Sequence, residues 1–129
     1  ILFVCIENSC RSQMAEAFLN MFGEGIVNAY SCGSSPSGKV NERAITFMAE
    51  FSYDMSKQKS KSVDELPAIE YEYVITMGCS DQCPVVPAKM HEDWDIEDPK
   101  HLSDKRFREI RSTIETRVKE LILRIKCSG

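Results

Sequence analysis

The sequence predicts a single α/β domain, with a parallel sheet of about four strands and helices on both faces. Short apolar segments rich in β-branched residues alternate with segments of helical periodicity along the whole chain. Such alternation implies crossover connections, and therefore parallel strands. The length of 129 residues is usual for one domain, so we expect residues 1–129 to form one unit without a linker.

Residues 1–22 predict a strand followed by a helix. The first six residues form a continuous apolar run, which favours a strand buried on both faces. Apolar residues then recur at helical spacing at Met14, Phe18, Met21 and Phe22. We expect Ser12 to cap this helix, and Gly23 and Gly25 to end it.

Residues 25–51 predict a second strand and a second helix. The strand is expected from Gly25 to Cys32, and the loop SCGSSPSGKVN that follows is rich in turn residues. Asn41 is a suitable cap for a helix that runs to about Phe51.

The second half of the chain predicts two more strands and a long helix. Tyr71 to Met77 has the aromatic and β-branched content of a strand, and it ends at the loop GCSDQCP. A short strand is expected around Met90 to Trp94, ahead of DIEDP. From about Ser103 apolar residues at steps of three and four predict an amphipathic helix, namely Phe107, Ile110, Ile114, Val118, Leu121, Ile122 and Ile125.

Charge and apolar content exclude two classes of partner. The net charge of -4 argues against nucleic acid as a partner, because binding to a phosphate backbone requires clustered Lys and Arg. No window approaches the roughly 18 apolar residues of a membrane span, so we expect no membrane association. The chain shows no signal-peptide pattern and has strand and helix patterns unlike those of a disulfide framework, so its six cysteines favour a reducing, cytoplasmic setting.

Residues 5–12, CIENSCRS, lie between the first expected strand and the helix after it. Parallel sheets bind ligands outside the carboxyl ends of their strands, and backbone N–H groups at a helix start bind anions. The guanidinium of Arg11 can grip two oxygens of a tetrahedral oxyanion. The same positive field favours a thiolate at Cys5, and the Ser12 hydroxyl can donate to that sulfur. The expected oxyanion-binding residues are Ile6, Glu7, Asn8, Ser9, Cys10 and Arg11.

A structural interpretation of this loop also remains open. The pattern C-x5-R is short, and Cys5 is also a suitable small apolar residue for the end of a buried strand, with Arg11 on the surface of a helix. The nucleotide-binding pattern GxxxxGK[ST] is absent, so neither ATP nor GTP is the expected phosphate ligand.

The segment VCIENSCRSQMAEAF resembles the active-site loop of the low-molecular-weight protein tyrosine phosphatase fold, and NSCRSQMAE resembles the arsenate reductases within that fold. The segments YSCGSSP, VITMGC, CP and DWDIEDP resemble later parts of the same family, so the resemblance covers nearly the whole chain. It implies a low-molecular-weight phosphatase-like fold, with Cys5 as nucleophile, Arg11 as oxyanion clamp and Ser12 as donor to the thiolate.

Asp98 in IEDP matches the Asp-Pro that this family places over the nucleophile as general acid. A carboxylic acid there can protonate the oxygen that leaves the central atom when the thiolate attacks. The acidic cluster is otherwise an ordinary solvated loop, and it also contains alternative acids at Glu92, Asp93, Asp95 and Glu97.

Two features favour a reductase over a phosphatase. Phosphatases that act on phosphotyrosine carry aromatic residues just after this Asp-Pro, where this chain has Lys100 and His101. The loop GCSDQCP also supplies Cys79 and Cys83, and a pair of cysteines after the third strand resolves the oxidised nucleophile in thioredoxin-coupled arsenate reductases. The resemblance thus implies that Cys5 attacks arsenate, arsenite leaves, and a disulfide passes from Cys5 to this pair.

The electron donor is open between two classes. TMGCSDQCP is more similar to the loop of reductases that use a small thiol, whereas Cys10 matches an auxiliary cysteine of the thioredoxin-coupled group. We expect an external reductant, either thioredoxin or a low-molecular-weight thiol, and no tightly bound cofactor.

Cys79 and Cys83 have other interpretations: buried loop residues, a protective disulfide, or zinc ligands with Cys10 or His91. C-x3-C is not the usual zinc spacing, so we expect no metal site. Asn8, Glu16 and Ser31 match part of a potassium site in some relatives, but Lys61 lies near the place of a further carboxylate, so bound potassium is not predicted.

The expected function is therefore reduction of arsenate to arsenite in arsenical resistance and detoxification, with phosphate and sulfate as competing oxyanions. Arsenate and phosphate have the same shape and charge, so a phosphatase for phosphotyrosine or small phosphate esters is the alternative. A second alternative is an oxyanion-binding or redox-sensing module without turnover.

Overall fold

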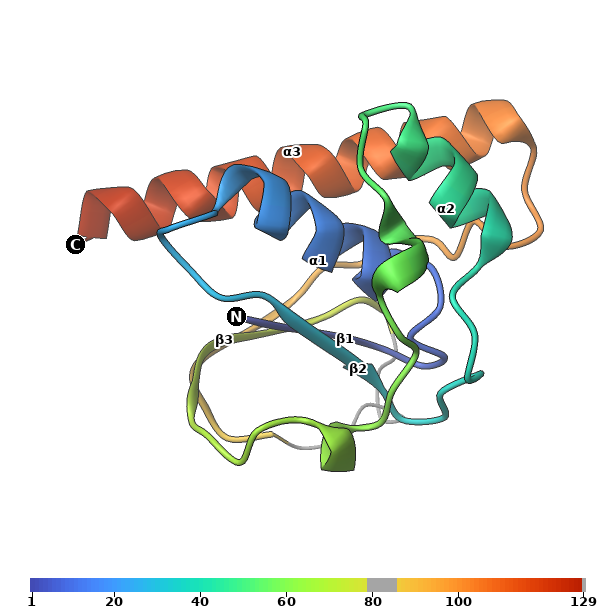
Figure 1. Ribbon diagram of the computed structural model, residues 1–129. Coiled ribbons are helices and arrows are strands. Elements are labelled where there is room, and N and C mark those ends of the chain that lie inside the picture. Colours follow the sequence, from blue (N-terminus) through green and yellow to red (C-terminus); the bar gives the residue numbers. More distant parts are fainter. Residues whose placement is uncertain (79–85, 129) are drawn as a thin grey trace.

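The computed structural model describes residues 1–78 and 86–128, which form one four-stranded sheet and three α-helices (Figure 1). The strand order is β2-β1-β3-β4, and every neighbouring pair is parallel. The strands are β1 (Leu2–Cys5), β2 (Tyr30–Gly33), β3 (Tyr71–Thr76) and β4 (Ala88–Asp93). The predicted α/β class with about four parallel strands is confirmed.

The two faces of the sheet are covered unequally. The helices α1 (Arg11–Phe22), α2 (Glu42–Ala49) and α3 (Asp104–Ser128) lie on the same side of the sheet (Figure 1). On that side Phe3 shares one core with apolar residues of all three helices. On the other side Leu2 and Val4 pack with Val63 of the short 3-10 helix η2 (Val63–Glu65). Helices on both faces were predicted, but within the described ranges the second face has only this 3-10 turn.

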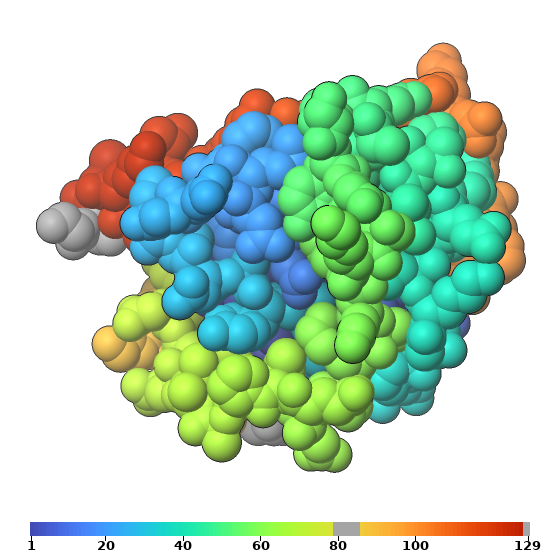
Figure 2. Space-filling model, viewed as in Figure 1, coloured from blue at the N-terminus to red at the C-terminus, as the bar shows by residue number. Residues whose placement is uncertain are grey.

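Two helices follow their sequence patterns closely. The Asn41 side chain caps α2 as predicted, accepting hydrogen bonds from the N–H groups of Arg43 (2.9 Å) and Ala44 (3.1 Å). The periodic apolar residues of α3 are buried at Phe107, Ile110, Ile114, Val118, Leu121 and Ile122. The 3-10 helix η1 (Met55–Lys57) and the residues around it pack beside α1 and α2, as Figure 2 shows in green against blue and blue-green.

Two element boundaries differ from the prediction. The first helix has Cys10, not Ser12, at its N-cap, because Ser12 is already the second helical residue and its hydroxyl faces the preceding strand. The second strand begins at Tyr30 rather than Gly25, because the chain first turns back on itself, with Val27 N–H donating to the Gly23 carbonyl at 3.0 Å.

The strand order reverses direction at β1. The chain passes from β1 to β2 on one side, and β3 then pairs with β1 on its other side. A crevice opens outside the carboxyl end of a strand at such a switch point. The loop between β1 and α1 therefore occupies the expected ligand-binding position of this sheet. In the part of the chain that is described, no helix combines the length and apolar character needed to cross a membrane.

Candidate active site

The loop of residues 6–10, which joins β1 to α1, has its backbone carbonyls tied to the surrounding chain. Each carbonyl oxygen accepts one hydrogen bond: that of Ile6 from the Ser35 N–H (2.8 Å), that of Glu7 from the Ser37 N–H (3.0 Å), that of Asn8 from Gln13 Nε2 (3.0 Å), that of Ser9 from the Asn41 N–H (2.8 Å) and that of Cys10 from the Met14 N–H (2.9 Å). The N–H groups of residues 7–10 donate to no other described residue. Since buried N–H groups require acceptors, this loop is built to receive the oxygens of an anion.

A cavity of about 150 Å³ lies inside this loop. It is lined by Cys5, Ile6, Glu7, Ser9, Cys10, Arg11 and Asp98. These residues come from the end of β1, the loop after it, the start of α1 and the loop before α3. The cavity therefore brings the predicted nucleophile and clamp together with the predicted acid, Asp98, which lies far from them in the sequence.

Cys5 ends β1 with its sulfur buried beside the first turn of α1. Its Sγ lies 2.8 Å from the Ser12 hydroxyl oxygen. Asn8 Nδ2 donates to the same hydroxyl at 2.8 Å, so the Ser12 proton is free to point at the sulfur. A hydroxyl that donates to sulfur stabilises the thiolate, which is the nucleophilic form of cysteine.

Arg11 is anchored at one nitrogen of its guanidinium. Nη1 donates to the carbonyls of Met77 (2.5 Å) and Ile96 (3.0 Å), and the residue is only 8% exposed. This anchoring leaves Nη2 and Nε for an oxyanion in the cavity. Gly78 has a φ of 81°, and a Cβ there would lie 3.3 Å from Nη1, so a larger residue would crowd the guanidinium.

Asp98 lies at the opening of the cavity. Its Oδ2 is 4.0 Å from Arg11 Nη2, its Oδ1 accepts from the Lys100 N–H at 3.1 Å, and its side chain is 41% exposed. The four alternative acids do not line the cavity, and three of them have partners of their own. Glu92 bonds Trp94 and Arg124, Asp93 bonds Thr76, and Glu97 pairs with Arg106.

The thiols of Cys10 and Cys32 have raised pKa values, whereas a nucleophilic cysteine reacts as the thiolate. Burial raises the pKa of Cys10 well above its ordinary range, and the charges of Asp98 and Cys5 raise it further. Burial also raises the pKa of Cys32 to about 12, although the nearby charge of Lys61 opposes this. Both groups therefore remain neutral thiols at physiological pH.

Asn8 lies at the centre of a polar network that holds the loop in place, as its match to a family asparagine implies, and Gln13 is the member of this network that the sequence did not indicate. It adopts a φ of 49° and is fully buried. Its Oδ1 accepts from Gln13 Nε2 and from the Lys61 N–H, both at 2.9 Å. Gln13 also bonds the Lys59 carbonyl at 2.8 Å, which ties α1 to the segment after η1. The helical pattern gave no sign of this role, since Gln13 is an ordinary helix residue in sequence.

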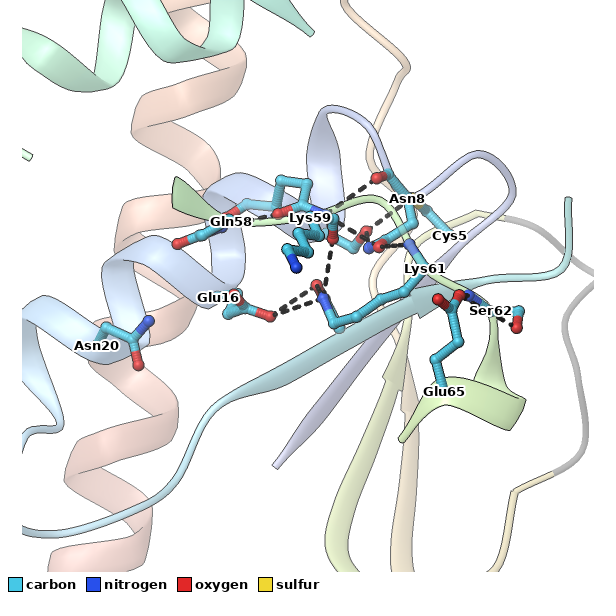
Figure 3. A network of polar contacts seen from close by, with 12 residues as sticks. Cys5, Asn8, Glu16, Asn20, Gln58, Lys59, Lys61, Ser62 and Glu65 are labelled. Carbon is cyan, nitrogen blue, oxygen red and sulfur yellow. Dashed lines mark hydrogen bonds and ion pairs between the residues drawn. The ribbon is translucent and has the colours of Figure 1, made fainter. Parts of the chain in front are cut away.

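The side chain of Lys61 reaches under the loop to an acidic site (Figure 3). Its Nζ lies 3.6 Å from Glu16 Oε1 and 3.3 Å from the Ser31 hydroxyl, which itself donates to Glu16 at 2.7 Å. The Glu16 side chain is 10% exposed, so its charge requires a partner. The ammonium of Lys61 provides that partner from within the chain.

The end of β2 lies against the loop. A Cβ at Gly33 would come within 2.4 Å of the Ile6 carbonyl oxygen and 2.9 Å of the Asn8 nitrogen. Only a glycine fits such an approach.

The remaining predicted site residues, Cys79 and Cys83, lie outside the described residues. Among residues 1–78 and 86–128, no group of three or more His, Cys, Asp or Glu side chains is placed to hold a metal ion. His91, the other zinc ligand considered, has its Nε2 at 3.0 Å from the Val86 carbonyl.

A parallel sheet with a cysteine at the end of its first strand, an anion-binding loop and an arginine at the start of the next helix defines the class of phosphatase-like oxyanion enzymes. The family model described as "low molecular weight phosphotyrosine protein phosphatase" matches residues 1–128. The chain belongs to this family, among its arsenate reductase members.

Individual relatives agree with this assignment over the full chain. The glutaredoxin arsenate reductase of Synechocystis sp. is 40% identical over 128 residues, covering 97% of both chains. A solved arsenate reductase in the phosphate binding state has a TM-score of 0.85 at 38% identity, covering 96% of both chains. A thioredoxin-dependent arsenate reductase from Corynebacterium glutamicum has a TM-score of 0.80 at 32% identity, covering 99% of this chain and 62% of that one. The predicted family and fold are confirmed.

Proposed function

We propose that this protein is a single-domain arsenate reductase that converts arsenate to arsenite with electrons from an external thiol. The full-length similarity to arsenate reductases carries the choice of substrate, since the cavity accepts phosphate and sulfate by the same chemistry. Reliance on reduced thiols fits the cytoplasm, where arsenate reduction would serve arsenical detoxification and resistance.

Binding uses the loop and Arg11. The N–H groups of residues 7–10 and the free nitrogens of Arg11 bind the oxygens of arsenate, each as a charge-assisted hydrogen bond. The bound anion then presents its arsenic to the sulfur of Cys5, whose thiolate is stabilised by the Ser12 hydroxyl. Asp98 faces the oxygen on the opposite, open side of the cavity.

The first chemical step forms a bond between sulfur and arsenic. The Cys5 thiolate attacks arsenic, one arsenic–oxygen bond breaks, and Asp98 donates a proton so that the oxygen leaves as water. A second thiol then attacks the Cys5 sulfur, and the electron pair of the sulfur–arsenic bond passes to arsenic. Arsenic(V) becomes arsenic(III) and leaves as arsenite, while the two sulfurs are oxidised to a disulfide.

We infer that Cys79 and Cys83 supply the second thiol and relay the disulfide outward. An external dithiol or small thiol then reduces it. The names of the relatives support either glutaredoxin or thioredoxin as the final donor, and so leave both classes to be tested.

Two assays test the proposal. Arsenite release is measured with dithiothreitol, with a thioredoxin system and with a glutathione–glutaredoxin system as donor, and hydrolysis of phenyl phosphate is measured in parallel. We expect turnover with at least one donor, loss of it in Cys5→Ser, and strong loss in Cys83→Ser. Cys127→Ser changes an exposed thiol of the last helix and should have no effect. Fast ester hydrolysis without arsenite would instead make the protein a phosphatase, and anion binding without either reaction would make it a binding module. Full arsenate turnover of Cys83→Ser with every donor would disprove the relay.

A further inference from the structure

The cavity inside the loop has room for one small anion. It measures about 150 Å³, and a water molecule takes about 30 Å³ in the liquid, so it holds about five waters. The atoms of a tetrahedral oxyanion are covalently joined, so the anion takes less space than five separate waters and fits within the cavity. Its bound oxygens would face the loop and Arg11, so an organic group on the remaining oxygen would extend toward the opening.

The opening of the cavity lies between Glu7 and Asp98. Cys5, Ser9 and Cys10 are 3%, 7% and 4% exposed, so they form the closed end. The side chains of Glu7 and Asp98 are 36% and 41% exposed, so they form the rim. The organic group of an ester would leave the cavity between these two carboxylates.

Lys100 connects both sides of this opening. Its Nζ lies 3.1 and 3.0 Å from the two carboxylate oxygens of Glu7, and its backbone N–H donates to Asp98. Bonding to Glu7 raises the pKa of the Lys100 ammonium above its ordinary value. The Glu7 backbone is itself fixed, because its carbonyl accepts from the Ser37 N–H and the Ser60 hydroxyl at 3.0 and 2.9 Å. The ion pair thus spans the opening between two anchored segments.

We infer that the Glu7–Lys100 ion pair determines substrate specificity by admitting free oxyanions and disfavouring their esters. A free oxyanion ends within the cavity and leaves the pair intact. The ring of an aryl ester would displace the ammonium, or cover both charged groups without replacing their hydrogen bonds, and either is unfavourable. The inference rests on the proposed function only in taking arsenate as the natural oxyanion, since phosphate fits the same cavity.

Binding measurements test this without turnover. Inorganic phosphate and phenylphosphonate are compared by the concentration at which each protects Cys5 from iodoacetamide, read by mass spectrometry. For the wild type we expect phosphate to protect at a concentration at least roughly tenfold lower. Lys100→Ala and Glu7→Ala should each reduce this preference by about fivefold, which is the upper range for a partly exposed pair. The double variant should match either single variant, because both remove the same pair.

A matched control is Lys39→Ala. Lys39 is paired with Glu42 at 2.9 Å on an exposed surface, whereas Lys100 bonds to Glu7 and Asp98, which line the cavity. The same change of charge at Lys39 should therefore leave the preference unchanged. Lys100→Met, which keeps most of the side chain's length, serves if Lys100→Ala unfolds. Three results would overturn the inference. The preference for phosphate could be unchanged in both Lys100 variants, it could fall in the double variant by the combined effect of the two single variants, or it could fall as much in Lys39→Ala as in Lys100→Ala.

The outcomes separate this inference from the proposed function. A shifted preference without arsenite production would uphold the role of the pair and reject arsenate as substrate. Arsenite production with an unshifted preference would uphold the reductase and reject the role of the pair.

Discussion

The Cys5 sulfur and the Ser12 hydroxyl oxygen lie 2.8 Å apart, and Asn8 donates to that hydroxyl from the other side. The arrangement leaves the Ser12 proton for the sulfur. A hydrogen bond to a charged group contributes about 1.5–3 kcal/mol, so we expect Ser12→Ala to lower kcat/KM for arsenate by roughly ten- to a hundredfold. Steady-state arsenite assays check this, with the exposed Ser35→Ala as control. A Ser12→Ala enzyme of wild-type activity would contradict it.

Replacement of Arg11 by lysine should weaken oxyanion binding while the fold is kept. Arg11 bonds two carbonyls through Nη1 and retains further donors for the ligand, whereas a lysine ammonium cannot do both. We expect at least a roughly hundredfold rise in the phosphate concentration that protects Cys5 from alkylation. The exposed Arg106→Lys is the control, and equal protection in the Arg11 and Arg106 variants would reject the clamp role.

Asp98→Asn should lower kcat much more than it raises KM. The amide keeps the size of the side chain but cannot donate a proton to the leaving oxygen, which typically costs about a hundredfold or more in rate. Asp95→Asn changes a nearby exposed carboxyl that does not line the cavity, so it should retain activity. Pre-steady-state and steady-state arsenite release provide both constants. If Asp95→Asn proved the more damaging variant, the acid would be misassigned.

Stability should fall at alkaline pH because of Cys32. Its pKa is raised by burial to about 12 in the fold, against about 8.5 when unfolded. The folded protein therefore holds the proton more tightly, and the stabilising contribution is complete below pH ~8.5 and is lost as the pH rises toward 12. Buried Cys10 also has a raised pKa and contributes a similar loss. Between pH 8.5 and 9.5, urea unfolding should show a further loss of up to about 1 kcal/mol from Cys32, and Cys32→Ala should remove this part. An unchanged pH slope in Cys32→Ala would contradict this.

Lys61 and Glu16 should be strongly coupled in stability. Their side chains are only 20% and 10% exposed, so Lys61→Met leaves a nearly buried carboxylate without its cation. We expect a loss of about 2–3 kcal/mol in the free energy of unfolding, largely restored in the double variant with Glu16→Gln. Lys89→Met breaks an exposed pair with Glu72 and should change stability by about 0.5 kcal/mol or less. If the double variant lost as much free energy of unfolding as the two single variants together, the two residues would not interact.

The fold was predictable because its signals are local. The apolar run of β1, the Asn41 cap and the periodicity of α3 each depend on neighbouring residues, and all three appear in the structure. The start of β2 was wrong because IVNA has the composition of a strand, while its backbone follows the turn set by Gly23. Composition cannot reveal that the partner strand β1 spans only four residues.

The site was predictable where its residues are close in sequence or belong to a recognisable sequence motif. CIENSCRS supplies Cys5, Arg11 and Ser12, and IEDP supplies Asp98. The supporting contacts were not predictable, since Glu7 and Lys100 are 93 residues apart, and Asn8 and Lys61 are 53 apart. The roles of Cys79 and Cys83 stay predictions, because both lie beyond the described part of the chain.

The hydrogen-bonded carbonyls of residues 6–10 have a consequence for how fast the anion binds and how the product leaves. A loop already held by five outside donors needs no ordering when an anion arrives, so encounter can be fast and little entropy is lost. The same rigidity prevents the loop from closing around the product. Release then follows from the change in charge. Arsenate is an anion, whereas arsenite is neutral at physiological pH, so the fixed N–H groups of the loop bind the product less strongly than the substrate.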